Sequence, residues 1–210
     1  MIRSFLVLLL LTSQLVFAAN NSHPSAPSNV ETILIVGDSI SAAYGIQSQF
    51  AWSHLLGTKL SQAKMPYQVI NASISGDTTI NGLNRFEPLL NKYKPRIVII
   101  ELGGNDGLRG LSVKQMKRNL KKMVELSQQA NAKVLLAGMK IPPNYGKRYT
   151  RAFYQVYTDI SNEYAIELIP FLLEGIGGVS ELMQDDGIHP NAEAQPLILN
   201  IVWQKLQSML

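Results

Sequence analysis

The sequence predicts an α/β fold: a three-layer α/β/α sandwich around a central, mostly parallel, five-stranded sheet. Short runs rich in Val, Ile and Leu alternate with longer stretches that carry apolar residues at helical spacing. The runs are continuously apolar, which is typical of strands that helices cover on both faces. Strands and helices that alternate in this way indicate repeated βαβ units and a parallel sheet.

The first expected strand is the run Ile33-Leu34-Ile35-Val36. It ends in the polar turn Gly37-Asp38-Ser39, and the small residues that follow predict a sharp turn into a helix behind Ser39. Ligands of open α/β sheets bind at the carboxyl ends of strands, so Ser39 is displayed where chemistry usually occurs. Alternatively, Ser39 is only a helix N-cap, because Asp and Ser are preferred capping residues.

The later elements alternate in the same way. The expected order is a helix over 50–60, a strand over 67–70, a helix over 79–93, a strand over 96–101, a helix from Ser112 to about Ala130, a strand over 133–138, a helix over 151–164, a strand over 166–169, and a helix from Asn191 to Leu210. Ser112 and Gln115 form a capping-box pattern, and Asn191 is expected to cap the last helix. Pro88 is expected to shorten or kink its helix.

The first nineteen residues have the order of a secretory signal peptide. Arg3 precedes the apolar run Phe5–Leu11, and the small residues Ala18 and Ala19 follow. The run is too short for a comfortable membrane span. We therefore expect export, to the periplasm or beyond it, with cleavage after Ala18 or Ala19; an uncleaved anchor is the alternative.

Residues 20–30 are polar and contain two prolines, which predicts a flexible lead-in, and residues 31–210 form one domain. A composition of 46% hydrophobic and 16% charged residues is that of a globular protein. The chain has no cysteine, which excludes disulfides, thiolate metal sites and a cysteine nucleophile. Basic residues are scattered apart from the run Lys117–Lys122 on one helix, so we expect no nucleic-acid partner.

Four polar, glycine-bearing segments are expected at one edge of the sheet. They are GDS at 37–39, SGD at 75–77, GGND at 103–106 and DGIHP at 186–190. A serine hydrolase needs a nucleophile, a base within hydrogen-bond reach, a carboxylate that orients the base, and donors for the developing oxyanion. The four segments supply each of these groups.

His189 is the candidate base. His23 lies in the lead-in, and His54 lies within a predicted helix, so only His189 stands in a loop at the predicted edge. Asp186, three residues earlier, is close enough in sequence for a local contact with the imidazole. The same spacing also occurs in ordinary turns and helix starts.

Asn105 follows a buried strand behind two glycines, where its amide could donate to a substrate. The alternative is a left-handed turn, which Asn and Gly both favour. Gly76 is either a turn residue or a backbone donor that a substrate approaches closely. Asp77 and Asp106 are turn residues or a metal pair; we expect no metal, because no second histidine is available to join them.

These segments resemble the SGNH-hydrolase superfamily, the GDSL lipases and esterases, which is defined by Ser, Gly, Asn and His in four blocks in this order. The resemblance extends over nearly all of the chain from Glu31 onward. The stretches NASISGDTT, ELGGNDGLRGL, PPNYGKRY and MQDDGIHPNAEAQP are similar to the bacterial branch of acyl-CoA thioesterase I, lysophospholipase and arylesterase.

The resemblance implies that Ser39 is the nucleophile, His189 its general base and Asp186 the residue that orients His189. It also implies an oxyanion hole made of the backbone N–H groups of Ser39 and Gly76 and the side chain of Asn105. No cofactor is implied, and we expect a monomer. The sequence assigns no specific role to Asp38.

The family usually has Gly-Tyr after the nucleophile segment, where this chain has Ala43-Tyr44. The departure should matter only if this position needs a positive φ, which alanine disfavours. No G-x-S-x-G elbow surrounds any serine, which argues against the α/β-hydrolase fold.

The activity implied is hydrolysis of acyl esters, thioesters or lysophospholipids through an acyl-enzyme. Residues 107–111, with Leu108, are expected to form one wall of an acyl groove that can move on binding, with Ile141 and Tyr145 on a facing loop; ordinary loop packing is the alternative. Two other functions stay open: a carbohydrate O-acetylesterase of the same superfamily, and a non-catalytic binding protein on this fold.

Overall fold

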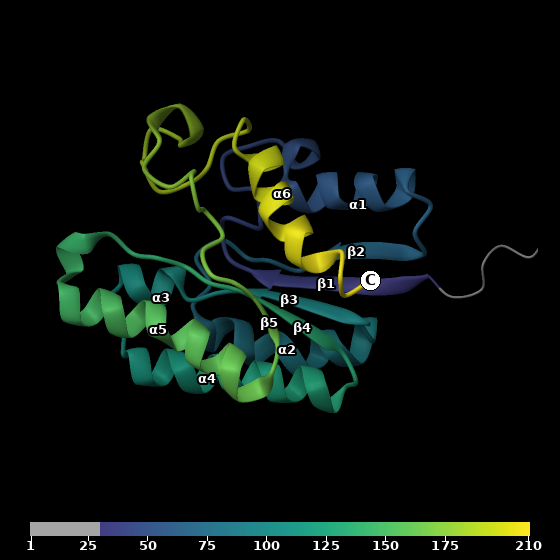
Figure 1. Cartoon of the computed structure of the whole chain (residues 1–210), viewed down its shortest axis with the longest axis horizontal. Helices are drawn as coiled ribbons and strands as arrows, with labels where there is room; N and C mark the ends of the chain where they lie inside the picture. Colours follow the sequence, from purple (N-terminus) through teal and green to yellow (C-terminus); the bar gives the residue numbers. More distant parts are fainter. Residues whose placement is uncertain (1–29) are drawn as a thin grey trace, which may run out of the picture.

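The computed structural model describes residues 30–210. The predicted signal segment, 1–19, and nearly all of the lead-in, 20–29, lie outside the described residues. A five-stranded sheet with the order β2-β1-β3-β4-β5 runs through the middle of the molecule, and every pairing in it is parallel (Figure 1). The strands are β1 Glu31–Gly37, β2 Tyr67–Asn71, β3 Ile97–Glu101, β4 Lys133–Ala137 and β5 Glu167–Ile169. The predicted α/β fold is confirmed.

Helices cover both faces of this sheet. They are α1 Trp52–Gln62, α2 Thr79–Tyr93, α3 Gly104–Leu108, α4 Val113–Gln129, α5 Lys147–Tyr164 and α6 Gln195–Leu206. In Figure 1, α1 and α6 lie on one side of the sheet, and α2, α4 and α5 lie on the other. The large side chains of Trp52, Phe86, Phe153 and Tyr157 are fully buried between helices and sheet. The predicted three layers are therefore present.

The central strands are apolar because neither of their faces meets water. Residues 33–36 of β1 and 97–100 of β3 have no exposed surface. Helices pack on both faces of a parallel sheet, so an alternating pattern would bury polar side chains in one of the two layers. β1 and β3 run in register, and Gly37 stands opposite Glu101 at their carboxyl ends.

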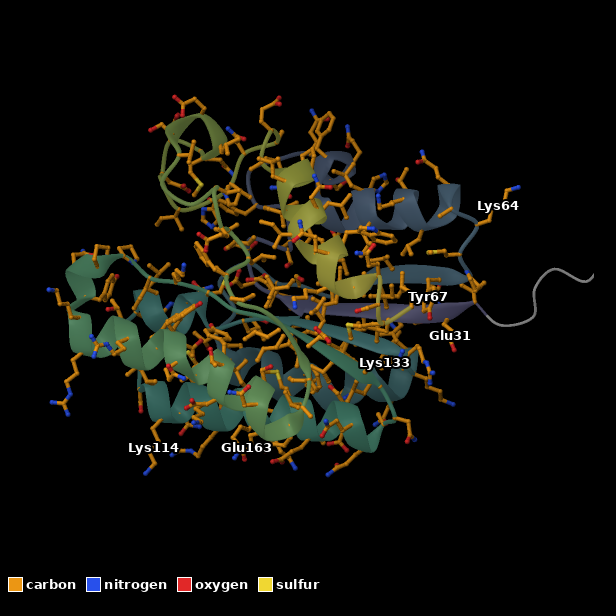
Figure 2. All side chains as sticks on the ribbon, viewed as in Figure 1. Glu31, Lys64, Tyr67, Lys114, Lys133 and Glu163 are labelled. Atoms are coloured by element: carbon orange, nitrogen blue, oxygen red, sulfur yellow. The ribbon has the colours of Figure 1, made fainter. Side chains whose placement is uncertain are left out.

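The two ends of the sheet differ in what they carry. Figure 2 shows Glu31, Tyr67 and Lys133 together at the end where β1, β2 and β4 begin. The four glycine-bearing segments lie toward the opposite end, where the strands finish. Within residues 30–210, no helix combines the length and the apolar character that a bilayer crossing requires.

The predicted helix behind Ser39 is wrong. Residues 38–46 form bends and turns, and the first α-helix begins only at Trp52. The reason lies at Ala43, whose φ of 60° is left-handed and cannot continue a right-handed helix.

Three other helix boundaries also differ from the prediction. α5 begins at Lys147 rather than Arg151, and a short helix, α3, forms where a loop was expected. α6 begins at Gln195, because Pro196 occupies its first turn, where a missing N–H costs nothing, and it ends at Leu206 rather than at Leu210. Asn191 therefore caps the turn before α6, accepting a hydrogen bond from the N–H of Ala194 at 3.2 Å. Pro88 lies inside α2 without ending it.

Candidate active site

Ser39 lies in a tight turn that directly follows β1. The N–H of Ala42 donates to the carbonyl of Asp38 at 2.9 Å, and the N–H of Tyr44 donates to the carbonyl of Ser39 at 3.0 Å. The φ of Ala43 is 60°, so the position that differs from the usual family pattern does need a left-handed backbone. The sequence predicts that alanine in place of glycine matters if this position has a positive φ, and position 43 does have one.

The capping alternative for Ser39 fails, because no helix begins there. The local hydrogen bond is made by the neighbouring residue instead. Asp38 Oδ1 accepts a hydrogen bond from the N–H of Ile40 at 3.1 Å. The Ser39 hydroxyl is left to make a contact with a distant part of the chain.

That contact is with His189. Ser39 Oγ lies 2.9 Å from His189 Nε2, although 150 positions separate the two residues in the sequence. His189 Nδ1 lies 2.6 Å from Asp186 Oδ2. The structure thus brings the three predicted residues into one hydrogen-bonded series, from hydroxyl to imidazole to carboxylate.

The Asp186 carboxylate is held in its ionised form. The hydrogen bond from the His189 side chain, followed by those from the N–H groups of His189 and Ile188, lowers the pKa of Asp186 to about 2. The two backbone bonds are 3.0 and 2.9 Å long. An ionised carboxylate at Nδ1 favours the imidazole tautomer in which Nε2 is free to accept a proton. His54 is exposed on α1 and takes no part in these contacts.

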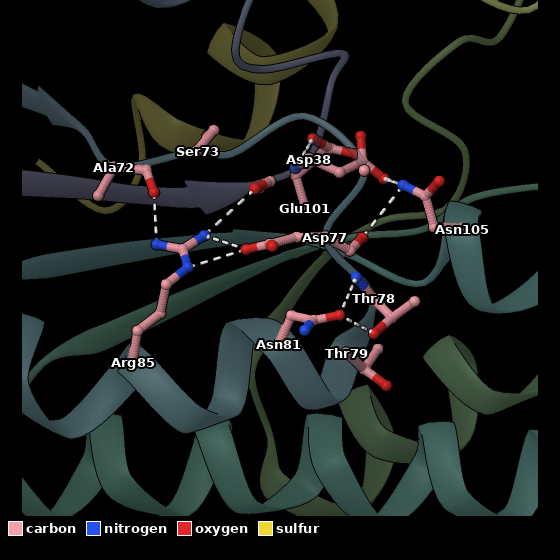
Figure 3. Close-up of polar contacts among 12 residues, drawn as sticks. Asp38, Ala72, Ser73, Asp77, Thr78, Thr79, Asn81, Arg85, Glu101 and Asn105 are labelled. Carbon is pink, nitrogen blue, oxygen red and sulfur yellow. Dashed lines mark hydrogen bonds and ion pairs between the residues drawn. The ribbon is translucent and has the colours of Figure 1, made fainter.

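Asn105 joins the first two glycine-bearing segments (Figure 3). Its Nδ2 donates to Asp38 Oδ2 at 3.2 Å and to the carbonyl of Asp77 at 3.1 Å. Asp38 precedes Ser39 and Asp77 follows Gly76, so the amide lies between the two predicted backbone donors. Asn105 stands in α3 and not in a left-handed turn; the left-handed residue is Gly103, with a φ of 116°.

Gly76 has a φ of 84°, the left-handed conformation that suits glycine. Its carbonyl accepts a hydrogen bond from Arg109 at 3.0 Å. The turn reading of Gly76 therefore holds, and it is compatible with a backbone donor at the same residue.

The two aspartates considered as a metal pair contact different partners. Asp77 forms an ion pair with Arg85 at 2.8 Å. Asp106 accepts hydrogen bonds from the N–H and the hydroxyl of Thr79, at 2.8 and 2.6 Å. Each carboxylate thus fixes the start of α2 or the loop before it, which accounts for both residues.

Arg85 is a site residue that sequence reasoning missed. Its guanidinium pairs with Asp77 and also donates to the carbonyls of Ala72 and Gly37 (Figure 3). It therefore joins the loops that follow β1 and β2. An arginine at an ordinary helix position looks like a solvated charge, so the sequence offers no signal for this role.

Tyr44 and Gln184 were also missed. The rings of Tyr44 and His189 lie 4.6 Å apart. Gln184 Nε2 donates to the carbonyl of Tyr44 at 2.7 Å and to the carbonyl of Pro190 at 3.1 Å. These contacts connect the histidine loop, residues 183–190, to the nucleophile turn, residues 38–46. The only sequence signal is that both residues stand inside the segments that carry the family resemblance.

Glu101 is the fourth site residue that sequence reasoning missed. It is fully buried at the end of β3, and its Oε2 accepts hydrogen bonds from Ser41 Oγ at 2.7 Å and from the N–H of Asp38 at 3.2 Å. Burial raises the pKa of Glu101 well above its ordinary value. A glutamate at a strand end is usually exposed, so nothing in the sequence marks this one as buried.

The three predicted groove residues have different surroundings. The Tyr145 hydroxyl donates to the carbonyl of Leu108 at 2.7 Å, so these two facing segments do meet. Ile141 is 9% exposed and packs on Gly107, where a Cβ would lie 2.5 Å from Ile141 Cγ2. Ile141 is therefore mainly a packing residue; it also lines a separate hollow of about 340 Å³ with Lys140, Lys147 and Arg151.

A larger hollow, of about 780 Å³, opens beside Asp186. Its lining is mostly polar: Tyr44, Gly45, Met183, Gln184, Asp185, Asp186 and Asn191. A lining of carboxylates and amides does not suit a hydrocarbon chain, because polar groups covered by an acyl chain would lose their water contacts.

Comparison with known proteins agrees with this geometry. Residues 35–196 match the model of the GDSL-like lipase/acylhydrolase family. The esterase TesA of Pseudomonas aeruginosa is 49% identical over 180 residues, which cover 86% of this chain and 90% of that protein. Thioesterase 1/protease 1/lysophospholipase L1 of Escherichia coli K12 is 44% identical over 180 residues, 86% of this chain and 85% of that protein.

A solved structure supports the same relationship. The psychrotrophic esterase EstA of a Pseudoalteromonas species, inhibited by monoethylphosphonate, matches this fold with a TM-score of 0.81 at 46% identity. The match covers 85% of this chain and 97% of that one. The sequence resemblance is thereby confirmed: the chain belongs to the GDSL-like lipase/acylhydrolase family.

Proposed function

We propose that this protein hydrolyses carboxylic-ester and thioester bonds of acyl substrates through a serine acyl-enzyme. Membership of the family supports the reaction class, and the relatives carry the names esterase and thioesterase. The observation that carries the proposal is the hydrogen-bonded series of Ser39, His189 and Asp186, with contacts of 2.9 and 2.6 Å.

In the first half of the reaction, His189 Nε2 takes the hydroxyl proton as Ser39 Oγ attacks the carbonyl carbon. A C–O bond forms, and the π electron pair moves to the carbonyl oxygen. Collapse of this intermediate breaks the bond to the leaving alcohol or thiol, which receives the proton from His189. In the second half, water repeats the attack on the acyl-enzyme, releasing the acid and restoring Ser39. Asp186 stabilises the imidazolium throughout.

The oxyanion is stabilised by the N–H groups of Ser39 and Gly76 and by the amide of Asn105. The two present contacts of the Asn105 amide are longer than 3 Å, so a developing oxyanion can share its hydrogens. Removing one such donor typically lowers kcat by about 10²–10³-fold.

A substrate panel with a nucleophile variant tests this function. Wild-type protein should release p-nitrophenol from acyl esters, cleave acyl thioesters and lysophospholipids, and react with an organophosphonate probe. Ser39→Ala should lose both turnover and labelling, because no other hydroxyl within residues 30–210 forms a hydrogen bond with His189. Ser61→Ala, an exposed serine on α1, is the matched control and should behave as wild type.

Labelling that persists in Ser39→Ala would exclude this serine as the nucleophile. Wild-type protein without turnover on any ester would leave the binding-protein alternative. Activity confined to acetylated sugars would favour the O-acetylesterase alternative.

We further propose that the acyl chain lies along Leu108 and Tyr145, on the side of Ser39 away from the polar hollow. Leu108→Ala removes apolar surface there, so kcat/KM for long acyl chains should fall about tenfold more than for acetyl esters. The control is Leu197→Ala, an exposed leucine on α6. An unchanged chain-length profile would remove Leu108 from the acyl site.

Export is proposed from the signal-peptide pattern of residues 1–19. The full-length chain, expressed in a Gram-negative host, should appear in the osmotic-shock fraction. Its mass should correspond to a chain that begins at residue 19 or 20. Protein of full mass in the cytoplasmic fraction would contradict the proposal.

A further inference from the structure

Two buried carboxyl groups lie beneath the nucleophile turn, and the ester mechanism does not use either of them. Glu101 is 0% exposed and Asp38 is 2% exposed. A buried carboxyl group is costly unless hydrogen bonds, a counter-charge or a proton compensates it. The contacts of Asp38 and Glu101 should therefore show what offsets the cost of burying each carboxyl group.

Glu101 supports the turn from below. Its Oε2 accepts hydrogen bonds from the Ser41 hydroxyl at 2.7 Å and from the N–H of Asp38 at 3.2 Å, on either side of Ser39. A Cβ at Gly37 would lie 2.5 Å from this oxygen, so the glycine leaves the space that the carboxyl group fills. The other oxygen, Oε1, has no hydrogen-bond partner among the described residues.

Asp38 connects the turn to Asn105. Its Oδ1 accepts from the N–H of Ile40 at 3.1 Å, and its Oδ2 accepts from Asn105 Nδ2 at 3.2 Å (Figure 3). A Cβ at Gly104 would lie 3.3 Å from the same Oδ2, so the carboxylate is enclosed by the start of α3. Asp38 thereby fixes the orientation of the Asn105 amide.

Both carboxyl groups of the pair have raised pKa values. Burial raises the pKa of Asp38 to about 6, and burial together with the charge of Asp38 raises the pKa of Glu101 well above its ordinary value. The hydrogen bonds from the N–H of Ile40 and from Asn105 favour the ionised form of Asp38. Glu101 is fully buried and its Oε1 has no partner among the described residues, so the neutral form is favoured at Glu101 rather than at Asp38. This leaves a single negative charge near the place where the oxyanion forms.

We propose that Asp38 and Glu101 are a positioning pair for the oxyanion hole. Protonated Glu101 holds the turn on both sides of Ser39, and ionised Asp38 orients the Asn105 amide. The inference rests on the proposed function, because the role of Asn105 as oxyanion donor belongs to that mechanism.

A double-mutant cycle tests the role of Asp38. In Asp38→Asn, whichever way the new amide is turned, its NH₂ faces either the N–H of Ile40 or the amide of Asn105. We expect kcat to fall about 10–100-fold with KM within about twofold, since a misplaced catalytic group costs rate rather than binding. In an Asn105→Ala background, the same substitution should lower kcat by less than about threefold, because the group it orients is gone.

An equal loss in both backgrounds would reduce Asp38 to a structural residue. Rates are normalised to the fraction of protein that an organophosphonate labels, so that misfolded protein does not enter the comparison. Wild-type protein without ester turnover would overturn the proposed function, whereas wild-type turnover with an additive cycle would overturn only the positioning pair.

Substitution of Glu101 tests the protonation state. Glu101→Gln keeps an uncharged side chain with a carbonyl that accepts from Ser41 and from the N–H of Asp38, so kcat should stay within about threefold of wild type. Glu101→Leu makes neither bond and should lose at least about tenfold in kcat per labelled site. A tenfold loss in Glu101→Gln would overturn the assignment of the proton to Glu101. If Glu101→Leu does not fold, the glutamine variant and the Asp38 cycle decide the matter.

Discussion

Ala43 is the residue on which the shape of the nucleophile turn depends. Its φ of 60° is left-handed, and a Cβ makes this conformation unfavourable by roughly 1–2 kcal/mol. Ala43→Gly should therefore raise the free energy of unfolding by about 1 kcal/mol, with kcat unchanged. Urea denaturation measures this difference. Ala42→Gly, whose φ is not positive, is the control and should lower stability; a destabilised Ala43→Gly would show that the turn does not store strain there.

Asp186 offers a second measurement at the scale of one residue. The His189 side chain is the largest cause that lowers the pKa of Asp186 to about 2. In His189→Ala this pKa should rise toward the ordinary value near 3.8, while the two backbone bonds keep it from rising fully. Carboxyl ¹³C NMR titration measures both values. An unchanged midpoint near pH 2 would mean that the backbone N–H groups alone set it.

The lowered pKa of Asp186 also determines how this residue's contribution to folding stability changes with pH. A carboxylate with a lowered pKa contributes stability that is present above its unfolded pKa, near 4, and is lost as the pH falls toward 2. Asp38 has the opposite sign. Its pKa is raised to about 6, so its contribution is most favourable in acid and weakens as the pH rises from about 4 through 6.

At the scale of elements, the side chain of Gln184 connects the histidine loop to the nucleophile turn. Gln184 donates to the carbonyls of Tyr44 and Pro190, and its own N–H donates to the carbonyl of His189 at 2.8 Å. Gln184→Ala removes the two side-chain bonds and should lower kcat roughly 10–100-fold by loosening the distance between Ser39 and His189.

Stopped-flow acylation with a chromogenic ester measures this loss. Gln62→Ala, on the exposed end of α1, is the matched control and should leave acylation unchanged. Acylation at the wild-type rate in Gln184→Ala would show that the histidine loop is held by its remaining contacts, such as the isolated pairing of Met183 with Pro190.

For the molecule as a whole, the sequence predicted what depends on burial and chain order. β1 and β3 could be predicted from the sequence because strands covered on both faces must be continuously apolar. His189 could be singled out because His23 and His54 lie outside the polar segments, whereas Ser39 and Asp186 were assigned through the family resemblance. The structure brings Ser39 and His189 together because the carboxyl ends of parallel strands share one edge.

The features that the sequence did not reveal depend on tertiary contacts. The left-handed φ of Ala43 is imposed by the turn and not by alanine, so the helix expected behind Ser39 could not be excluded. Arg85 and Glu101 look like surface charges at a helix face and a strand end. Arg85 donates to carbonyls of other segments, and Glu101 accepts from an N–H of another segment. The local sequence pattern around either residue does not indicate such distant partners.

The pairing of Gly37 with Glu101 constrains how this protein can diverge. The two residues stand opposite each other in the sheet, and any side chain at position 37 would occupy the place of the carboxyl group. A larger residue at position 37 therefore fits only if residue 101 is shorter or its carboxyl group moves away. A shorter residue 101 by itself would leave an empty space beneath the nucleophile.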